Sequence, residues 1–562
     1  MTTPVVDPAK RAPMLHLRHP EHHVPGYEMP DSASPPLKKW QLLLGFLIAV
    51  ALAFTAYFLH HASEGMTAPD VPLPWVLPFA LLLAGIATMP FIAKHFWEHH
   101  YHHISMVLGA IVAGYYIFAL SAGKNIAASM SEYISFIFLL GSLFIVSGGI
   151  LIRVRKRSTP LVNTSILLIG AVIANLFGTT GAAMLLIRPY LRINKGNIKP
   201  YHIVFFIFSV ANIGGALTPI GDPPLFLGFI KGVPFWWVMD HCLPIWLTAL
   251  GIVLAIFFVV DTIYARKNAK PAEASDADDL GPAISIYGGA NIIFIALVLA
   301  AVFIDPPYRE ILMAVAAFGS LATTPRRVHG ENSFNYAPIK EVAFLFIGIF
   351  ATMVPALNYL NKHASDEAFQ KYLATPGQFF FASGSLSAVL DNAPTYLTFL
   401  EVELGKFDNK DDRPVIEHER AVIARRSLEL TPDDLKDLTP EQTERLKALH
   451  AALVRYHGSD ILAGKVPATE VALGMLLDDT GKLVETRHTP AFPYYQILMA
   501  ISMGAVFFGA CTYIGNGPNF MVKSIAEHNG VACPSFFGYI LYYTIPVLLP
   551  TFILVWFIFL RI

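Results

Sequence analysis

The sequence predicts an all-α polytopic membrane protein with about 11 transmembrane helices and two re-entrant hairpins, arranged as two inverted repeats. The chain is 54% hydrophobic and 14% charged, with a mean hydropathy of +0.52. Its apolar runs recur at lengths close to the roughly 20 residues that a helix needs to cross a bilayer. Two further apolar segments contain polar residues and glycines near their middles, which is typical of hairpins rather than of complete spans.

The beginning of the chain is polar and is followed by a retained span. Residues 1–39 are rich in proline and histidine, and we expect a cytoplasmic N-terminal segment there. The apolar run at 40–61 lies too far along the chain, and is too long, to be a cleaved signal peptide. It is therefore predicted to be an extra first span outside the repeats.

The remaining spans follow from the apolar runs and from the basic residues between them. Positive clusters mark the cytoplasmic side, so the His-rich loop at 94–103 and the basic loop after residue 152 are predicted to be cytoplasmic. Histidines in that first loop would form a membrane-interface belt, a pH-sensing group or a metal site. The predicted spans are 40–61, 74–93, 104–121, 132–152, 202–230, 236–260, 286–304, 308–324, 341–360, 493–525 and 535–560.

One hairpin completes each half of the chain. The segment 163–189 has basic residues on both flanks, so both of its ends are predicted to lie in the cytoplasm. The segment 375–401 is interrupted in the same way, and the span count places its opening on the outer face. The polar insert 402–491 that follows is therefore predicted to be external.

Each half then contains five spans and one hairpin. The predicted repeats cover 74–260 and 286–560, joined by a cytoplasmic linker at 261–285. An odd number of crossings inverts the second repeat relative to the first, as in many secondary transporters. The insert contains a helix signal at Thr439, Pro440 and Gln442, and it is either a solvated elaboration of one loop or a binding and assembly element.

Two carboxylates inside interrupted apolar segments are the primary candidates for function. Asp222 ends the stretch NIGGALTPIGD, and Asp391 lies in LDNAPT. Ionisable residues at membrane depth usually line a cavity or a transport path, and broken helices in corresponding halves indicate the binding site of a secondary transporter. The alternative for each aspartate is an ordinary helix cap.

Neutral oxygens near these carboxylates extend the candidate site. They would coordinate a small cation, or the half-helix N-termini would bind an anion. The candidate side chains are Asn212, Thr218, Asn392, Thr395, Asn516 and Asn519, and the candidate hairpin tip is Gly178, Thr179 and Thr180. The sequence predicts no catalytic residues, no metal centre and no cofactor apart from sodium or a proton as coupling ion.

At these motifs the chain resembles the ion transporter superfamily, which includes NhaD-type sodium/proton antiporters, arsenite pumps, citrate/metal symporters and divalent-anion/sodium symporters. The stretch at 212–222 is similar to the NhaD-type pattern, and LDNAPT is similar to a hairpin motif of NhaD-type and arsenite members. The chain departs from the NhaD-type pattern at Pro223 and Pro224 and in its large insert. It most resembles a branch catalogued as putative citrate transporters.

The resemblance implies a secondary active transporter of the bacterial inner membrane, and its leading form is a sodium/proton antiporter that uses Asp222 and Asp391. The alternative is a sodium- or proton-coupled symporter of citrate or a related carboxylate, which a cationic side chain in the site, such as Arg188 or Lys523, would favour. The expected partners are a small cation or carboxylate and the lipid bilayer, with no nucleic acid and a possible homodimer. A membrane-embedded enzyme or scaffold is the third alternative, but the sequence lacks metalloprotease, serine-hydrolase and phosphate-loop motifs.

Overall fold

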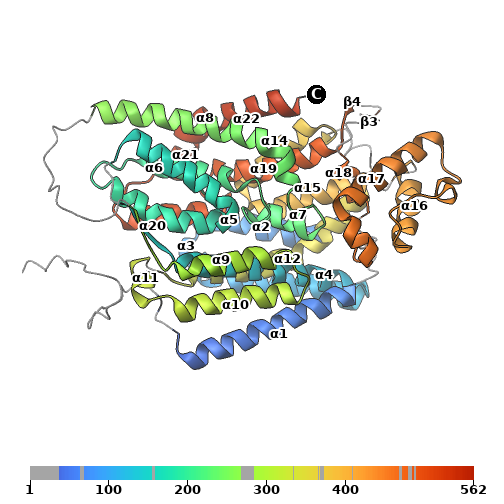
Figure 1. Cartoon of the computed structure of the whole chain (residues 1–562), viewed down its shortest axis with the longest axis horizontal. Helices are drawn as coiled ribbons and strands as arrows, with labels where there is room; N and C mark the ends of the chain where they lie inside the picture. Colours follow the sequence, from blue (N-terminus) through green and yellow to red (C-terminus); the bar gives the residue numbers. More distant parts are fainter. Residues whose placement is uncertain are drawn as a thin grey trace, which may run out of the picture.

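The described chain forms a bundle of helices, many of them long and apolar as in a multi-pass membrane protein (Figure 1). The computed structural model describes residue 34 and residues 37–561 except 64–68, 155–157, 268–283, 333, 365, 367–371, 408, 410, 467–470, 479–483 and 487–488. Most of the predicted N-terminal segment, part of the basic loop after residue 152 and most of the predicted linker lie outside these described residues.

Eight helices of the described chain are long and apolar enough to cross a membrane, and shorter apolar helices lie between them. The predicted all-α polytopic fold class is therefore confirmed. The long elements are α1 (Lys39–Ser63), η1 (Leu73–Val76) with α2 (Leu77–Ile92), α3 (Lys94–Gly114) with η2 (Tyr115–Ala119), α4 (Gly123–Gly148), α5 (Pro160–Ile193), α8 (Trp237–Lys267), α12 (Ala337–His363) and the C-terminal run α21 (Phe536–Tyr539), η6 (Ile540–Leu548), α22 (Leu549–Val555) and η7 (Trp556–Leu560). The shorter α9 (Ala290–Ala301), α10 (Tyr308–Thr323) and α11 (Arg326–Glu331) precede α12.

Helix α5 folds back on itself at Gly178. This glycine has a φ of +73°, which only a residue without Cβ adopts readily, and it separates two helical limbs. The ends of the limbs meet, because Asn163 and Asn194 exchange two side-chain hydrogen bonds of 3.0 and 2.9 Å. Although α5 is long enough to span a bilayer, its two limbs lie side by side as a hairpin.

The second hairpin consists of α14 (Pro376–Val389) and α15 (Asn392–Lys406). Thr375 caps α14 and Gln378 completes the capping box, which fixes where the first limb begins. The Lys406 ammonium at the end of α15 donates to the Leu373 carbonyl and lies 4.4 Å from the centroid of the Phe379 ring. The start and the end of this hairpin are therefore also adjacent.

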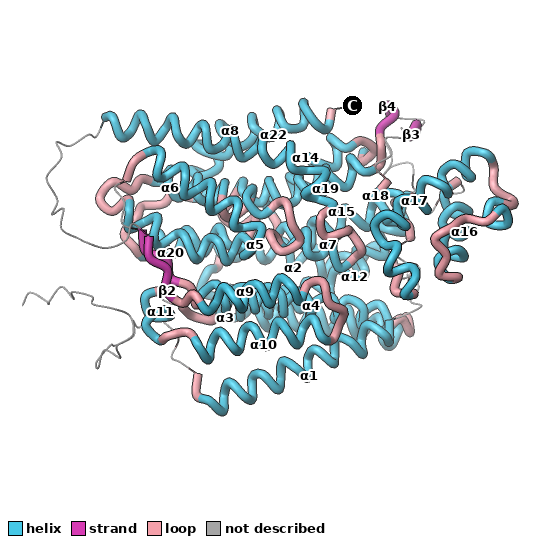
Figure 2. The backbone as a smooth tube through the Cα atoms, in the orientation of Figure 1, coloured by secondary structure: helices cyan, strands magenta, loops and turns pink. Residues whose placement is uncertain are grey.

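Two helices are interrupted in the middle of the bundle. The first consists of α6 (Pro200–Ser209), the 3-10 turn η3 (Ile213–Gly215) and α7 (Pro223–Ile230). The second consists of α19 (Tyr495–Phe508), the 3-10 turn η5 (Gly509–Cys511) and α20 (Gly517–His528). Figure 2 shows the loop segments that join these half-helices inside the bundle.

Side chains from neighbouring helices satisfy the carbonyls that these breaks release. The Trp246 indole donates to Ile213 O at 2.7 Å, the Tyr539 hydroxyl to Ala510 O at 2.8 Å and the Thr544 hydroxyl to Cys511 O at 2.7 Å. An unpaired backbone group costs several kcal/mol in a dry environment, so these donors allow irregular backbone at this depth.

The insert forms a helical unit that projects from one end of the molecule (Figure 1, orange). It contains α16 (Asp412–Ala424), η4 (Pro432–Leu435), α17 (Pro440–Ala463), α18 (Leu473–Leu477) and the strands β3 (Val484–Thr486) and β4 (Thr489–Phe492). The predicted helix start is confirmed, because Thr439 and Gln442 form the capping box of α17 with bonds of 3.0 and 3.2 Å.

Two helix boundaries and one strand pairing differ from the sequence expectation. The His-rich segment 94–103 was predicted to be a loop, but it is the first half of α3. Helix α8 continues to Lys267, beyond the predicted span end at residue 260. In addition, β1 (Leu151–Val154) pairs antiparallel with β2 (Ile284–Tyr287). Hydropathy locates the apolar part of a helix. It does not show where the helix ends when the helix continues through polar residues.

Candidate ion and substrate site

Asp222 lies at the first break and is almost fully buried, with 1% of its surface exposed. It occupies the N-cap position of α7, yet its carboxylate makes no hydrogen bond to that helix. An N-cap side chain normally accepts from the second or third backbone N–H of its helix. Pro224 removes the second donor, and the third, Leu225 N, donates to the Asp222 backbone carbonyl at 3.1 Å, so the carboxylate is available to other elements.

Three side chains from other elements donate hydrogen bonds to this carboxylate. Thr179 Oγ1 and Asn516 Nδ2 donate to Oδ1 at 2.7 and 3.1 Å. Asn392 Nδ2 donates to Oδ2 at 2.5 Å. Both hairpin tips and the second break therefore converge on Asp222.

Asn392 also has a buried side-chain oxygen that accepts no hydrogen bond from the described residues. Its side chain is fully buried, and its Oδ1 has no hydrogen-bond partner in the described structure. Buried polar atoms are nearly always paired, so this unpaired oxygen next to a buried carboxylate is a candidate ligand atom.

Two more of the predicted asparagines, Asn212 and Asn519, hydrogen-bond to residues around the Asp222 site rather than to its carboxylate. Asn212 Nδ2 donates to Asn519 Oδ1 at 2.7 Å, and its own Oδ1 accepts from Asn516 at 3.3 Å. Asn519 Nδ2 in turn satisfies the carbonyls of Gly509 and Thr512. Asn212 and Asn519 thus tie the two breaks to each other, which is a positioning role.

Other predicted residues are bonded elsewhere. Asp391 caps α15 by accepting from Ala393 N at 3.1 Å, and Thr395 donates to the Asp391 carbonyl at 3.0 Å. Thr218 donates to the Asn175 carbonyl at 2.6 Å. Asp391 therefore makes the helix-cap bond that was the alternative to an ion-binding role, while Asp222 does not.

The sequence reasoning missed Asn175. Its Nδ2 donates to Gly214 O at 2.7 Å and its Oδ1 accepts from Leu217 N at 3.0 Å, so it joins hairpin 1 to the first break. Asn175 ends the first limb, three residues before the break at Gly178, whereas Thr179 begins the second limb. A polar residue three positions before the predicted hairpin tip was the available signal.

The tip of the first hairpin touches the first break directly. Thr179 N donates to Gly221 O at 2.8 Å, and Gly178 and Thr180 border a cavity of about 20 Å³ beside it. The opposite wall of the cavity is formed by apolar side chains of α4, including Leu139 and Leu143. A cavity of this size holds about one water molecule.

The same contacts recur in the two breaks. Each contains the pattern G-A-x-T-x-I-G, at 215–221 and at 509–515, and the threonine hydroxyl of each accepts from the last glycine N–H at 3.1 Å. The residue after each pattern is Asp222 in the first break and Asn516 in the second. The inverted repeats and their boundaries stay predictions, and these recurring contacts support them.

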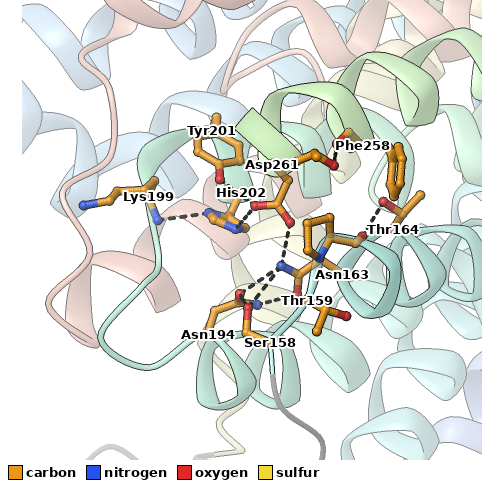
Figure 3. A network of polar contacts seen from close by, with 12 residues as sticks. Ser158, Thr159, Asn163, Thr164, Asn194, Lys199, Tyr201, His202, Phe258 and Asp261 are labelled. Atoms are coloured by element: carbon orange, nitrogen blue, oxygen red, sulfur yellow. Dashed lines mark hydrogen bonds and ion pairs between the residues drawn. The ribbon is translucent and has the colours of Figure 1, made fainter. Parts of the chain in front are cut away.

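The base of the first hairpin is held by a second polar network, shown in Figure 3. Asp261 of α8 accepts from the Tyr201 hydroxyl at 2.6 Å and from Asn163 Nδ2 at 2.9 Å. His202 Nδ1 accepts from Lys199 N, so its Nε2, 3.2 Å from Asp261, carries the proton. The hairpin is thereby fastened to α6 and α8.

A sequence profile of the protein family described as putative citrate transport matches residues 68–560, which include both hairpins, both breaks and the insert. The chain belongs to this family. Family membership and the long apolar helices together identify an integral multi-pass membrane protein of a transporter family.

Individual relatives are more distant. An uncharacterized transporter of Mycobacterium tuberculosis is 23% identical over 260 residues, which are 44% of this chain and 60% of the relative. An uncharacterized transporter of Mycobacterium bovis is 26% identical over 260 residues, which are 43% of this chain and 59% of the relative. The match thus covers about three fifths of the length of these relatives.

Proposed function

We propose that this protein is a secondary active transporter that binds sodium or a proton at Asp222, and that it exchanges the two as a sodium/proton antiporter. The observation that carries this proposal is the convergence on one buried carboxylate of donors from both hairpin tips and the second break. A carboxylate with neutral oxygens around it suits a hard cation such as sodium.

The hydrogen-bond donors around the Asp222 carboxylate suggest how a cation would take their place. Rotation of the Asn392 amide exchanges its donor nitrogen for Oδ1, which has no partner in the described structure. The same centre would then offer two oxygens to a cation instead of a proton donor to a carboxylate. Because a bare charge is costly inside a bilayer, binding of either sodium or a proton would also favour movement of the hairpin-bearing part of the protein.

The second candidate is symport of citrate or a related carboxylate with sodium or protons, and the family description favours it. In this mode Asp222 would hold the coupling ion. Of the two basic residues considered, Lys523 is 2.7 Å from Glu527 and is therefore neutralised, whereas Arg188 forms no ion pair with any described residue. In either mode we place the protein in a bacterial inner membrane with a cytoplasmic N-terminus.

The test uses proteoliposomes that contain an internal pH dye. Sodium or lithium is added to wild type, to Asp222→Asn and to Asp240→Asn, an exposed aspartate at the start of α8 that serves as the charge control. Antiport predicts cation-driven proton efflux in wild type and the control, with loss of the signal in Asp222→Asn. Absence of cation-driven efflux, together with citrate uptake under a sodium or pH gradient, would replace antiport by symport.

A further inference from the structure

Arg188 is a half-buried guanidinium whose Nη1 has no hydrogen-bond partner among the described residues. No carboxylate of the described part of the chain pairs with it either. Removing a charge from water without compensation is costly. A bound anion would remove that cost.

Arg188 belongs to a stripe of accessible residues on the second limb of the hairpin. From Thr179 to Arg192, the residues that are not buried are Thr180, Met184, Arg188 and Arg192. Residues four apart lie on one face of a helix, so these side chains form a single accessible stripe. Arg192 is exposed at the hairpin base, and Thr180 borders the small cavity at the tip.

This stripe faces α4 and the segment that follows it. A Cβ on Gly181 would lie 3.3 Å from Ser147 of α4, and Arg188 is two helical turns beyond Gly181 on nearly the same face. At the base, Arg192 lies close enough to Arg153 and Glu331 to interact with their charges. The stripe therefore lies on the side of the first hairpin that faces α4, and its base lies near β1 and α11.

The base of the stripe has an excess of positive charge. Glu331 already accepts from Arg153 at 2.6 and 2.5 Å and from Arg327 at 2.9 Å. Arg188 and Arg192 add two guanidinium groups to this corner without adding a carboxylate. An excess of one sign of charge between low-dielectric walls attracts ions of the opposite sign.

We propose that this stripe binds a small polycarboxylate anion, with the Arg188 guanidinium as the main contact, Arg192 as the outer contact and the Thr180 hydroxyl at the inner end. Arginine suits this ligand because its planar guanidinium binds a carboxylate through two parallel hydrogen bonds. The proposal rests on the symport form of the proposed function. The cavity beyond Thr180 holds about one water molecule and is too small for the anion, which would lie along the stripe instead.

The experiment measures citrate binding to the purified full-length protein by titration calorimetry. Arg188→Gln is expected to weaken binding by about tenfold or more, because a charge-assisted pair is lost. Lys195→Gln, which removes an exposed positive charge at the same end but outside the stripe, is expected to change binding by less than about twofold. Thermal unfolding without citrate separates docking from a structural role: Arg188→Gln should be as stable as wild type or more stable, and citrate should no longer raise its melting temperature.

Unchanged citrate affinity in Arg188→Gln would overturn the proposal, as would a large loss of stability in that variant without citrate. Displacement of citrate by equal concentrations of inorganic phosphate or by anionic lipid would overturn the assignment to a polycarboxylate. Asp222→Asn separates this proposal from the proposed function, because it should abolish coupled transport while citrate still binds at Arg188. Loss of citrate binding in Asp222→Asn would place the anion at the central carboxylate instead.

Discussion

At the scale of single residues, the close approach of two glycines shapes the site. A Cβ on Gly221 would lie 2.1 Å from the Gly215 carbonyl oxygen, and backbone on both sides prevents relief. We expect Gly221→Ala to cost about 1–3 kcal/mol of stability, and to abolish transport by displacing Asp222. Gly517→Ala, in the second break, meets no atom within 4 Å and should retain transport. Uptake assays and thermal unfolding of both variants test this, and equal activity of the two would contradict it.

At the scale of elements, the Asp261 network determines how firmly the first hairpin is held. Asp261→Ala leaves the buried Tyr201 hydroxyl without its acceptor and removes one of the acceptors of the Asn163 amide, so we expect a loss on the order of 3 kcal/mol. The control is Thr262→Ala, whose exposed hydroxyl bonds only a carbonyl of its own helix. Melting temperatures in detergent measure the difference, and a similar small change in both variants would argue against a fastening role.

The insert contains a buried pair that makes its stability depend on pH. Burial lowers the pKa of His450, but the hydrogen bond that its ring donates to Glu419 at 2.9 Å and the charge of that carboxylate raise the pKa by more, and the charge of Asp434 acts in the same direction. The net pKa lies above the ordinary value of 6.5. Below about pH 6.5 the pair therefore stabilises the folded insert fully, and the stabilisation disappears as the pH rises through the raised pKa.

We expect hydrogen exchange in α16 and α17, corrected for the intrinsic rate, to show less protection at pH 8.5 than at pH 6. His450→Gln should remove this pH dependence at a cost on the order of 1 kcal/mol below pH 6.5. His418→Gln is the matched control, because within the described part of the chain the His418 ring is hydrogen-bonded to the backbone carbonyls of Pro414 and Lys436 and to no carboxylate. Protection that stays constant with pH in wild type would show that the pair has no such effect.

Sequence patterns located the elements better than they located the contacts. Hydropathy and the helix-breaking glycines and prolines identified the spans and the interruption at Gly178, because these signals are local. The helical continuation through the histidines of α3 left no hydropathy signal. Similarly, Asp222 and Asp391 have the same local appearance, and only the tertiary fold distinguishes a carboxylate facing both hairpin tips from one that caps its own helix.

At the scale of the whole molecule, Asp222 and Asn516 occupy matching places after the two G-A-x-T-x-I-G patterns. Exchanging them in the double variant Asp222→Asn, Asn516→Asp moves the carboxylate to the equivalent position while conserving the donor set. We expect Asp222→Asn alone to reduce the rate of coupled transport by about 100-fold relative to wild type. The double variant should be about tenfold faster than Asp222→Asn. Initial rates in proteoliposomes measure both, and no recovery would show that the two breaks have different roles.

The projecting insert has a practical consequence for imaging. Most of the bundle is a set of similar helices surrounded by detergent or lipid, which gives a small particle few features for alignment. Helices α16 and α17 protrude from one end only, and the capping box at Thr439 and the ion pair between Arg445 and Asp412 at 2.5 Å order them. They form a built-in fiducial mark that defines the two ends of each particle without an added antibody fragment.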